Sequence, residues 1–505
     1  MLYHLYELNH AMIAPMRAFA KWGEAALTDR SNPFSETLWA KNAVAAFDLF
    51  ESLTRRYGKP AFGLDTTEIA GREVGVTEKV VWEKPFCQLL HFERDLSGFS
   101  NRRKDPTLLI VAPLSGHYAT LLRGTVEALL PTHNIYITDW TDARTVPLSE
   151  GGFALDDYIS YLIEIAHFLG PAFHTLAVCQ PSVPVLAAAG IMAAEKDPNR
   201  PLSMTLMGGP IDTRIAPTEV NELATKRGIE WFERNVIMTV PFPNPGAFRR
   251  VYPGFLQLGG FMAMNLDRHV SAHKDYFNHL VEGDGDNAAK HREFYDEYLS
   301  VMDMEADYYL QTVERVFCEH HLPRGLFTYK DALVDLSAID DIALMTVEGE
   351  KDDISGVGQT RAAHTLCTAL PETKRMHSSA IMACSTARAG ARKSHPKSPN
   401  SSRRTKSADS HSVAKTWLSL RKALNSSALP AGSRKNIVAC SPGRPANRTC
   451  GSITNSMFAP RKRPASASHS FHGKITPKCG TGTLSPSTAF AATSALSRPD
   501  TCATI

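Results

Sequence analysis

The sequence predicts an α/β domain with a mostly parallel sheet covered by helices, followed by a long tail that does not fold. Short apolar runs alternate with amphipathic helical segments up to about residue 376, which is the pattern of βαβ units. The composition then changes, because residues 377–505 contain 20 Lys and Arg, two acids, 24 Ser and no Tyr. Such a segment buries too little apolar surface to offset its chain entropy, so we expect it to be disordered.

Residues 1–100 are expected to form an N-terminal helical region and the first strands. The segment "NAVAAFDLFESLTRRYG" has apolar residues at helical spacing and ends at Gly58. The first 27 residues resemble an amphipathic helix, because a signal peptide would need a basic stretch followed by an uninterrupted apolar one. No run of about 18 apolar residues exists, so we expect no membrane span. We therefore expect a cytoplasmic protein with reduced thiols.

Residues 101–376 form the expected α/β domain. Between about 215 and 335 the pattern changes to long helices, which we interpret as an insertion over the carboxyl edge of the sheet, where a lid would lie. The expected helices of the remainder are 118–130, 155–170 and one starting at Val183, and the expected strands are 107–114, 134–140, 175–180, 203–210 and 342–350.

Charge and cysteine content restrict the possible functions. The tail carries +18, whereas residues 1–376 hold 35 Lys and Arg against 50 Asp and Glu, a net −15. Four of the nine cysteines lie in the first 376 residues, and their spacings match neither a disulfide framework nor a zinc site. We therefore expect no metal and no cofactor. The basic tail by itself specifies no nucleic-acid partner, because charge without a groove-reading fold is not a recognition site.

Cys179 lies between an expected strand and a helix rich in small residues, in the segment "AVCQPS". A nucleophile on a sharp strand-to-helix turn needs this context, usually within Gly-x-Ser-x-Gly. Ala177 and Pro181 replace the two glycines, so the motif alone matches weakly. The alternative is that Cys179 is one more buried thiol, as most free cysteines are.

Two further segments supply possible partners for this cysteine. The loop in "VAPLSGHYATLLRG" follows the strand that should donate one N–H group to an oxyanion hole, with Ser115 at its centre, and the N–H group of Gln180 would be the other donor. In "TVEGEKDDISGVGQT", acids follow a late strand, where the orienting acid of such a triad belongs. Asp352 is better placed than Asp353. The alternatives are an ordinary tight turn and a solvated acidic loop.

From Met1 to about Met376 the chain resembles the bacterial intracellular polyhydroxybutyrate (polyhydroxyalkanoate) depolymerases. The resemblance rests on "VAPLSGHYATLLRGTVEALLPTHNIYITDW", "AVCQPSVPVL", "SMTLMGGPIDTR", "VYPGFLQLGGFMAMNLDRH" and "MTVEGEKDDISGVGQT". It implies an α/β-hydrolase fold with Cys179 as nucleophile and Asp352 as acid. The implied substrate is amorphous poly(3-hydroxybutyrate) in cytoplasmic granules. It implies no membrane or nucleic-acid partner, and the oligomeric state is left open.

The histidine that the family places after the last strand, in a Gly-His-Tyr-Gly-Val-Phe-like segment, is missing. His377 lies too early, and His395 stands among Lys, Pro and Ser. A frameshift after about residue 377 accounts for this, because one permitted choice of codons for Ala380 to Gly390 encodes the segment in the neighbouring frame. The alternatives are a genuine basic tail that binds nucleic acid or an anionic surface, or an anchor to granules.

Three interpretations of function follow. The first is a polyester depolymerase whose literal chain lacks the last strand, the catalytic histidine and the C-terminal helix, and is therefore impaired. The second is a polyhydroxyalkanoate synthase-like acyltransferase, which usually keeps glycine at both positions where Ala177 and Pro181 stand. The third is a catalytically inactive granule-binding protein. Aromatic residues of the insertion are candidates for polymer contact, although core packing is the simpler role for most: Phe242, Phe248, Tyr252 and Phe255.

Overall fold

The computed structural model describes residues 2–29, 31–99 and 104–380, which lie in one compact unit. Its centre is a sheet of nine described strands in the order β1-β2-β3-β5-β4-β6-β7-β13-β14. The strands β1 to β3 are antiparallel, and the other six are parallel to one another. Their bounds are β1 (Thr66–Ile69), β2 (Arg72–Lys84), β3 (Cys87–Arg94), β4 (Thr107–Val111), β5 (Asn134–Trp140), β6 (Phe173–Val178), β7 (Ser203–Met207), β13 (Ala343–Gly349) and β14 (Arg375–Ala380).

The parallel strands form the core because their sequences are apolar on both faces. In β4 the residues Leu108–Val111 are all buried, and Ile110 aligns with Ile137 of β5 and Leu176 of β6. A parallel strand needs both faces covered, and a continuous Leu and Ile run meets that requirement. By contrast, the long strand β2 alternates and exposes much of its length, as an antiparallel strand can.

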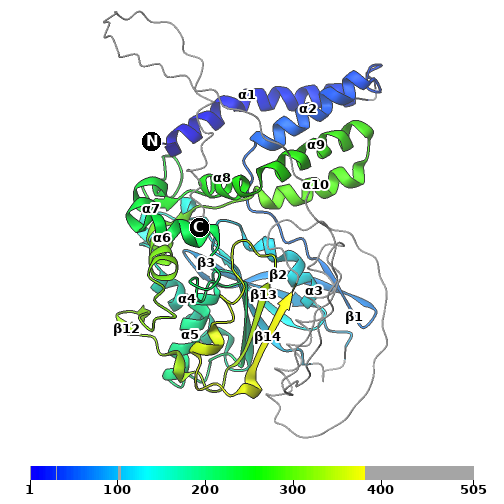
Figure 1. Ribbon diagram of the computed structural model, residues 1–505. Coiled ribbons are helices and arrows are strands. Elements are labelled where there is room, and N and C mark those ends of the chain that lie inside the picture. The colour runs from blue at the N-terminus through cyan, green and yellow to red at the C-terminus, as the bar shows by residue number, and fades with distance from the viewer. Residues whose placement is uncertain (1, 30, 100–103, 381–505) are drawn as a thin grey trace, which may run out of the picture. The chain divides into compact units, whose positions relative to one another are not determined.

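Helices cover both faces of this sheet (Figure 1). In the figure α4 (Leu155–Leu169) and α5 (Ser182–Ala194) lie on one side, and α3 (Arg123–Leu129) lies on the other. The helix α5 packs against α4 and is buried almost all round, because its alanines and Gly190 let the neighbouring backbones approach closely. The helix α12 (Ala363–Leu366) precedes β14. The predicted pattern of alternating strands and helices is confirmed here.

The segment between β7 and β13 is the predicted insertion, but it is not only helical. A three-stranded sheet, β10-β9-β8, and a β11-β12 hairpin interrupt the helices. The stretch that we expected to be long helices through residues 290–317 breaks after Tyr298 and passes through β10 before it becomes helical again. The bounds are α6 (Glu219–Arg227), α7 (Ile229–Val236), β8 (Met238–Thr239), β9 (Arg250–Tyr252), α8 (Gly254–Met264), α9 (Leu266–Glu282), α10 (Gly285–Tyr298), β10 (Met304–Glu305), α11 (Ala306–Thr312), a π-helix (Val313–Cys318), β11 (Thr328–Tyr329) and β12 (Ala332–Leu333).

The N-terminal residues form a helical hairpin, α1 (Leu2–Thr28) and α2 (Leu38–Thr54), beside α9 and α10 (Figure 1). This confirms the expected helices, although the second ends at Thr54 and not at Gly58. The start of α1 is tied to the insertion, since the Tyr3 hydroxyl donates to the Asp303 carboxylate at 2.6 Å. The ring of Tyr6 stacks on Phe255 with the centroids 4.1 Å apart.

The last strand corrects our expectation that the literal chain lacks it. Residues Arg375–Ala380 form β14, which pairs in parallel with β13 over the register Leu344↔Arg375 to Gly349↔Ala380. With β14 in place, the strand order from β2 onward, including the exchange of β4 and β5, is that of the α/β-hydrolase fold. The expected disorder of the tail falls outside the described residues. None of the described helices is long and apolar enough to cross a membrane.

Candidate active site

Cys179 occupies a sharp turn between β6 and α5, at the carboxyl edge of the parallel strands. Its φ is +67°, a left-handed conformation that a non-glycine residue adopts only where the surrounding structure holds it. The Cys179 N–H group donates to the Met207 carbonyl of β7 at 2.7 Å, and the Cys179 carbonyl accepts from the Ser182 N–H group at 3.1 Å. The turn is therefore fixed on both sides, as a nucleophile elbow requires.

Two glycines after β7 make room for this turn. A Cβ atom on Gly209 would lie 2.2 Å from the Cβ atom of Ser182 and 3.1 Å from the Cys179 carbonyl oxygen. Gly208 has a φ of +59°, and a Cβ atom there would lie 3.5 Å from the Oδ2 atom of Asp352. Because Gly208 and Gly209 have no side chains, this segment runs between Cys179 and Asp352 and leaves space between them.

The Cys179 thiol is held in its neutral form. Burial, the larger cause, and the Asp352 carboxylate together raise its pKa to about 11, and only the Gln180 N–H group acts in the opposite direction. None of these described influences is a histidine or another cation. A reactive thiolate needs such a partner, because cysteine nucleophiles depend on a lowered pKa.

The loop after β4 lies where the second oxyanion donor was expected. Ser115 is half-buried, and Gly116 has a φ of +105° with its carbonyl accepting from the Met302 N–H group at 2.7 Å. A Cβ atom on Gly116 would meet the Gln257 side chain at 2.3 Å, so only glycine fits there. The helical insertion therefore fixes this loop, and the turn is not merely a solvated connection.

Gln180, the residue after the cysteine, is buried and is connected to the same loop. The Tyr308 hydroxyl donates to Gln180 Oε1 at 2.7 Å and also lies 3.4 Å from the Leu114 carbonyl oxygen. Gln180 Nε2 is buried and has no hydrogen-bond partner among the described residues. Tyr308, from α11 of the insertion, thus bridges the two segments that would form an oxyanion hole.

Asp352 lies in the loop after β13, half-buried, whereas Asp353 is exposed. The Asp352 Oδ1 atom accepts from the N–H groups of Ile354 at 2.9 Å and Ser355 at 3.1 Å, which orients the carboxylate. Its charge acts on the Cys179 thiol, and Asp353 is not among the influences on that thiol. The geometry therefore favours Asp352 over Asp353 as the partner of the cysteine.

Three of the described histidines form contacts with groups other than the Cys179 thiol. His377 lies within β14, where its Nδ1 atom is 2.8 Å from the Thr346 hydroxyl and its Nε2 atom is 3.8 Å from Glu348. His364 shares the same hydroxyl at 2.9 Å. His117 packs against Phe261 and bonds the Tyr298 carbonyl, and burial lowers its pKa. His395 lies outside the described residues.

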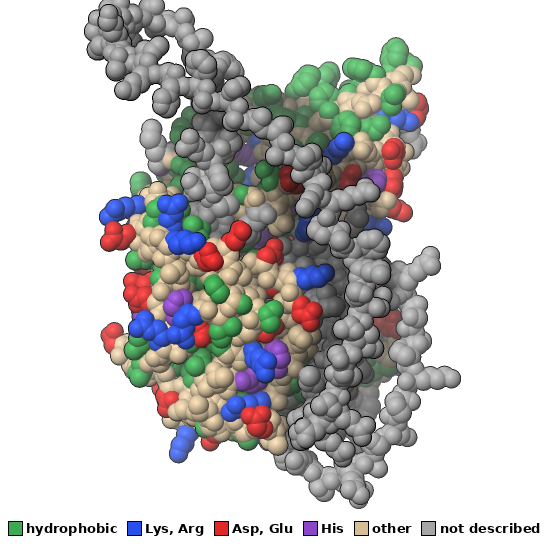
Figure 2. Space-filling view, viewed as in Figure 1, with side chains coloured by type: hydrophobic (Ala, Val, Ile, Leu, Met, Phe, Trp, Pro, Cys, Tyr) green, Lys and Arg blue, Asp and Glu red, His purple; other side chains and the backbone are tan. Residues whose placement is uncertain are grey.

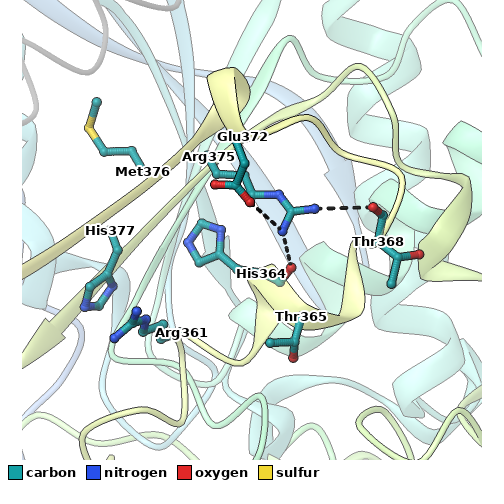
Figure 3. A pocket seen from close by; sticks show the side chains of 8 residues that line it. All are labelled: Arg361, His364, Thr365, Thr368, Glu372, Arg375, Met376 and His377. Atoms are coloured by element: carbon teal, nitrogen blue, oxygen red, sulfur yellow. Dashed lines mark hydrogen bonds and ion pairs between the residues drawn. The ribbon is translucent and has the colours of Figure 1, made fainter. Parts of the chain in front are cut away.

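A hollow of about 470 Å³ lies beside β14, at the edge of the sheet (Figure 3). Arg375 crosses it, and its guanidinium group bonds the backbone carbonyls of His364 and Thr368 and pairs with Glu372 at 3.5 Å. None of the predicted site residues lines it. Within the described residues, no three His, Cys, Asp or Glu side chains are grouped so as to hold a metal ion.

A family model described as "PHB de-polymerase C-terminus" matches residues 208–384. The match begins at the glycine pair beside Cys179, includes the whole insertion and Asp352, and ends just after β14. Over this segment the chain is similar to the PHB depolymerase family. This partial match and the strand order of the sheet together support a hydrolase. No match was found among curated proteins.

Three of the solved structures similar to this chain are named as a lipase, a thioesterase domain and a hydrolase. A monoacylglycerol lipase of Paleococcus ferrophilus is 11% identical, with 54% of this chain and 83% of that chain covered and a TM-score of 0.32. The thioesterase domain of the curacin biosynthetic pathway is 10% identical, with 60% and 92% covered and a TM-score of 0.32. An α/β-fold hydrolase of Bacillus anthracis is 11% identical, with 60% and 91% covered and a TM-score of 0.27.

Three features of this candidate site were not found from the sequence. The glycine pair 208–209 was seen only as the end of a strand, although two glycines directly after an apolar run are a signal of close backbone approach. Tyr308 has no such signal, because its neighbours in α11 are equally aromatic. Thr360, whose hydroxyl bonds both the N–H group and the carbonyl of Gly209, lies in a loop with no periodic pattern.

Proposed function

We propose that this protein is an intracellular poly(3-hydroxybutyrate) depolymerase that uses Cys179 as its nucleophile, and that the literal chain is impaired. The left-handed turn at Cys179 is the observation that carries the proposal. It holds the thiol next to the Gln180 N–H group and under the influence of Asp352. The proposed location is the cytoplasm, on the surface of polymer granules.

In the proposed reaction, a histidine oriented by Asp352 takes the thiol proton of Cys179, and the thiolate attacks an ester carbonyl of the polymer. The N–H groups of Gln180 and of the loop around Ser115 stabilise the oxyanion. The C–O bond then breaks, and the leaving alkoxide takes the proton from the imidazolium. Water, activated by the same histidine, hydrolyses the thioester and returns the thiol.

We propose that the histidine of this scheme is lost through a frameshift after about residue 377. The family match ends at residue 384, near the change in composition, which supports this proposal. A neutral thiol with a pKa of about 11 also agrees with a missing base. Loss of one member of a cooperative triad lowers the rate by about 10³- to 10⁶-fold.

Sequencing the gene around codons 376–382, together with an activity comparison, tests both proposals. Release of hydroxybutyrate from amorphous polymer should be at least about 10³-fold faster for a frame-corrected chain than for the 505-residue chain. In the corrected chain Cys179→Ala should abolish the release, whereas Asp353→Asn should retain it. An intact reading frame in independent reads would remove the frameshift, and fast Cys179-dependent release by the 505-residue chain would contradict the impairment.

The raised thiol pKa also favours a second candidate, a granule-binding protein without catalytic activity. The two candidates predict different results for a frame-corrected chain. A binding protein would sediment with the polymer but release no hydroxybutyrate, whereas a depolymerase would release it. A synthase-like acyltransferase is less well supported, since Ala177 and Pro181 stand where that class keeps glycine.

A further inference from the structure

The outward side of α1 is an apolar surface with almost no charge. Along it, at helical spacing, lie six large side chains that are 51–68% exposed, and we call them the outer face of α1: Leu5, Leu8, Met12, Met16, Phe19 and Trp22. Over this span a helix advances about 26 Å. Contiguous apolar surfaces of this size are rare on monomeric proteins and mark sites of interaction.

The Lys and Arg side chains of α1 both have partners within the hairpin. Lys21 is the only Asp, Glu, Lys or Arg among the exposed residues of α1, and its Nζ atom lies 3.0 Å from Glu51. Arg17 donates to the Thr54 carbonyl at 2.8 Å. Helices that bind anionic membranes present unpaired Lys and Arg on the polar side. The outer face of α1 is therefore complementary to a neutral apolar surface and not to an anionic one.

The apolar surface extends beyond a single helical seam. At the tip of the hairpin, where α1 turns into α2, Phe34, Leu38 and Trp39 are 64–70% exposed. Apolar side chains gather over this hairpin in Figure 2. At the other end, β8 contacts α1, and the loop after β8 exposes Phe242 and Phe248. A coiled coil with a second copy of α1 would bury only a narrow stripe along the helix. Docking on a flat surface would instead use the whole width of this apolar surface.

The hairpin is also connected rigidly to the proposed catalytic loop. Tyr3 at the start of α1 bonds Asp303, and the adjoining Met302 N–H group bonds the Gly116 carbonyl beside Ser115. The start of α1 is thus connected to this loop through residues 302 and 303 of the insertion.

We propose that the outer face of α1 docks on the neutral surface of a water-insoluble polyester. This inference rests on the proposed function for the identity of the polyester. Of the four aromatic residues of the insertion that were candidates for polymer contact, Phe242 and Phe248 are exposed in the loop after β8, the strand that contacts α1. Tyr252 is fully buried, and Phe255 packs against Tyr6.

Adsorption of the full chain on amorphous poly(3-hydroxybutyrate) particles, measured by co-sedimentation, tests the proposal. The variant Met12→Gln/Met16→Gln keeps good helix formers at both positions. Its affinity for the particles should fall by at least about tenfold. The matched control Leu326→Gln/Leu333→Gln changes two apolar residues that are 45% and 63% exposed near and within β12, and it should adsorb like the wild type. Far-ultraviolet circular dichroism verifies that both variants fold.

Equal adsorption of the α1 variant and the wild type would overturn the proposal, as would a wild type that does not adsorb. Two further measurements would identify a different binding partner for the outer face of α1. Stronger binding to anionic lipid vesicles than to polymer would assign the face to a membrane, and a wild-type dimer that the α1 variant converts to a monomer would assign it to a second copy. Because adsorption needs no hydrolysis, loss of ester cleavage would count against the proposed function alone.

Discussion

The Asp352 carboxylate acts on the Cys179 thiol in the direction that makes the thiol less reactive, because it raises the thiol pKa. Burial is the larger cause of the raised Cys179 pKa, and the Asp352 charge is the second. A thiolate next to a carboxylate is disfavoured, so at neutral pH the thiol stays protonated. In a complete triad a histidine would lie between them and reverse this effect. The described influences on this thiol therefore include no cation that would lower its pKa.

Neutralising Asp352 should make Cys179 more reactive in the literal chain, the opposite of its effect in a complete triad. Removal of the negative charge lowers the thiol pKa, so more thiolate is present at any pH below about 11. Asp352→Asn should accelerate alkylation of Cys179 by iodoacetamide at pH 8.5 by a few-fold, on the order of the change that a lowered thiol pKa produces. Peptide mass spectrometry separates Cys179 from the other thiols.

The exposed neighbour provides the control for this prediction. Asp353→Asn should leave the alkylation rate unchanged, because Asp353 is not among the influences on the thiol. Slower alkylation of Cys179 in Asp352→Asn would show that a cation, such as a histidine, already acts between the two groups.

At the scale of elements, the strand ends bring the site together, and the glycines permit it. The strands β4, β6, β7 and β13 end side by side, so that the segments after them meet at one edge. This arrangement could be predicted from the alternation of apolar runs and helices. The small sheet β8-β9-β10 could not, because its strands are two or three residues long and lie within a helical pattern.

Gly209→Ala should destabilise the elbow. The added Cβ atom would lie 2.2 Å from Ser182 and 3.1 Å from the Cys179 backbone, and neither can move without disturbing α5 or β6. The expected loss is about 1–3 kcal/mol in the free energy of unfolding, measured by urea denaturation. Gly259→Ala in α8 is the matched control, since open space surrounds that position and alanine favours a helix by about 0.8–1.0 kcal/mol. Equal effects of the two variants would contradict the crowding at the elbow.

At the scale of the whole molecule, the fold class, the order of the main strands and the position of the insertion could be predicted from local patterns. The candidate site could be predicted in part. Cys179, Gln180, Ser115 and Asp352 follow strand ends, which are visible in the sequence. Tyr308 could not be predicted, because its role depends on how a helix of the insertion packs onto two distant loops. The short strand β14 was missed because polar residues separate its few apolar ones.

Buried histidines should make the molecule sensitive to mild acid. His133 and His174 are fully buried, and burial lowers the pKa of each to about 4. Their neutral forms stabilise the fold above the unfolded pKa of about 6.5, and this stabilisation is lost as the pH falls toward 4. Asp303 and Glu305, with pKa values raised by burial to about 7, act in the opposite sense.

The variant His174→Asn isolates the contribution of one histidine. Between pH 7 and pH 5 the wild type should lose roughly 2 kcal/mol more stability than this variant, measured by urea denaturation at each pH. His167→Asn is the control, because that side chain is exposed and pairs with Asp197 at the surface. An identical pH dependence in all three proteins would show that His174 is protonated in the folded state.

The hydrogen bond between Tyr3 and Asp303 also sets the order of events during synthesis. Its partners are 300 residues apart in the chain. At about 5–20 residues per second, a ribosome needs about 15–60 s to reach the second after making the first. During that time α1 has left the ribosome, and its first turn lacks Asp303 while the side chains of its outer face are already present. The first turn of α1 therefore gains its contact with the insertion only late in synthesis, whereas its outer face is exposed from the start.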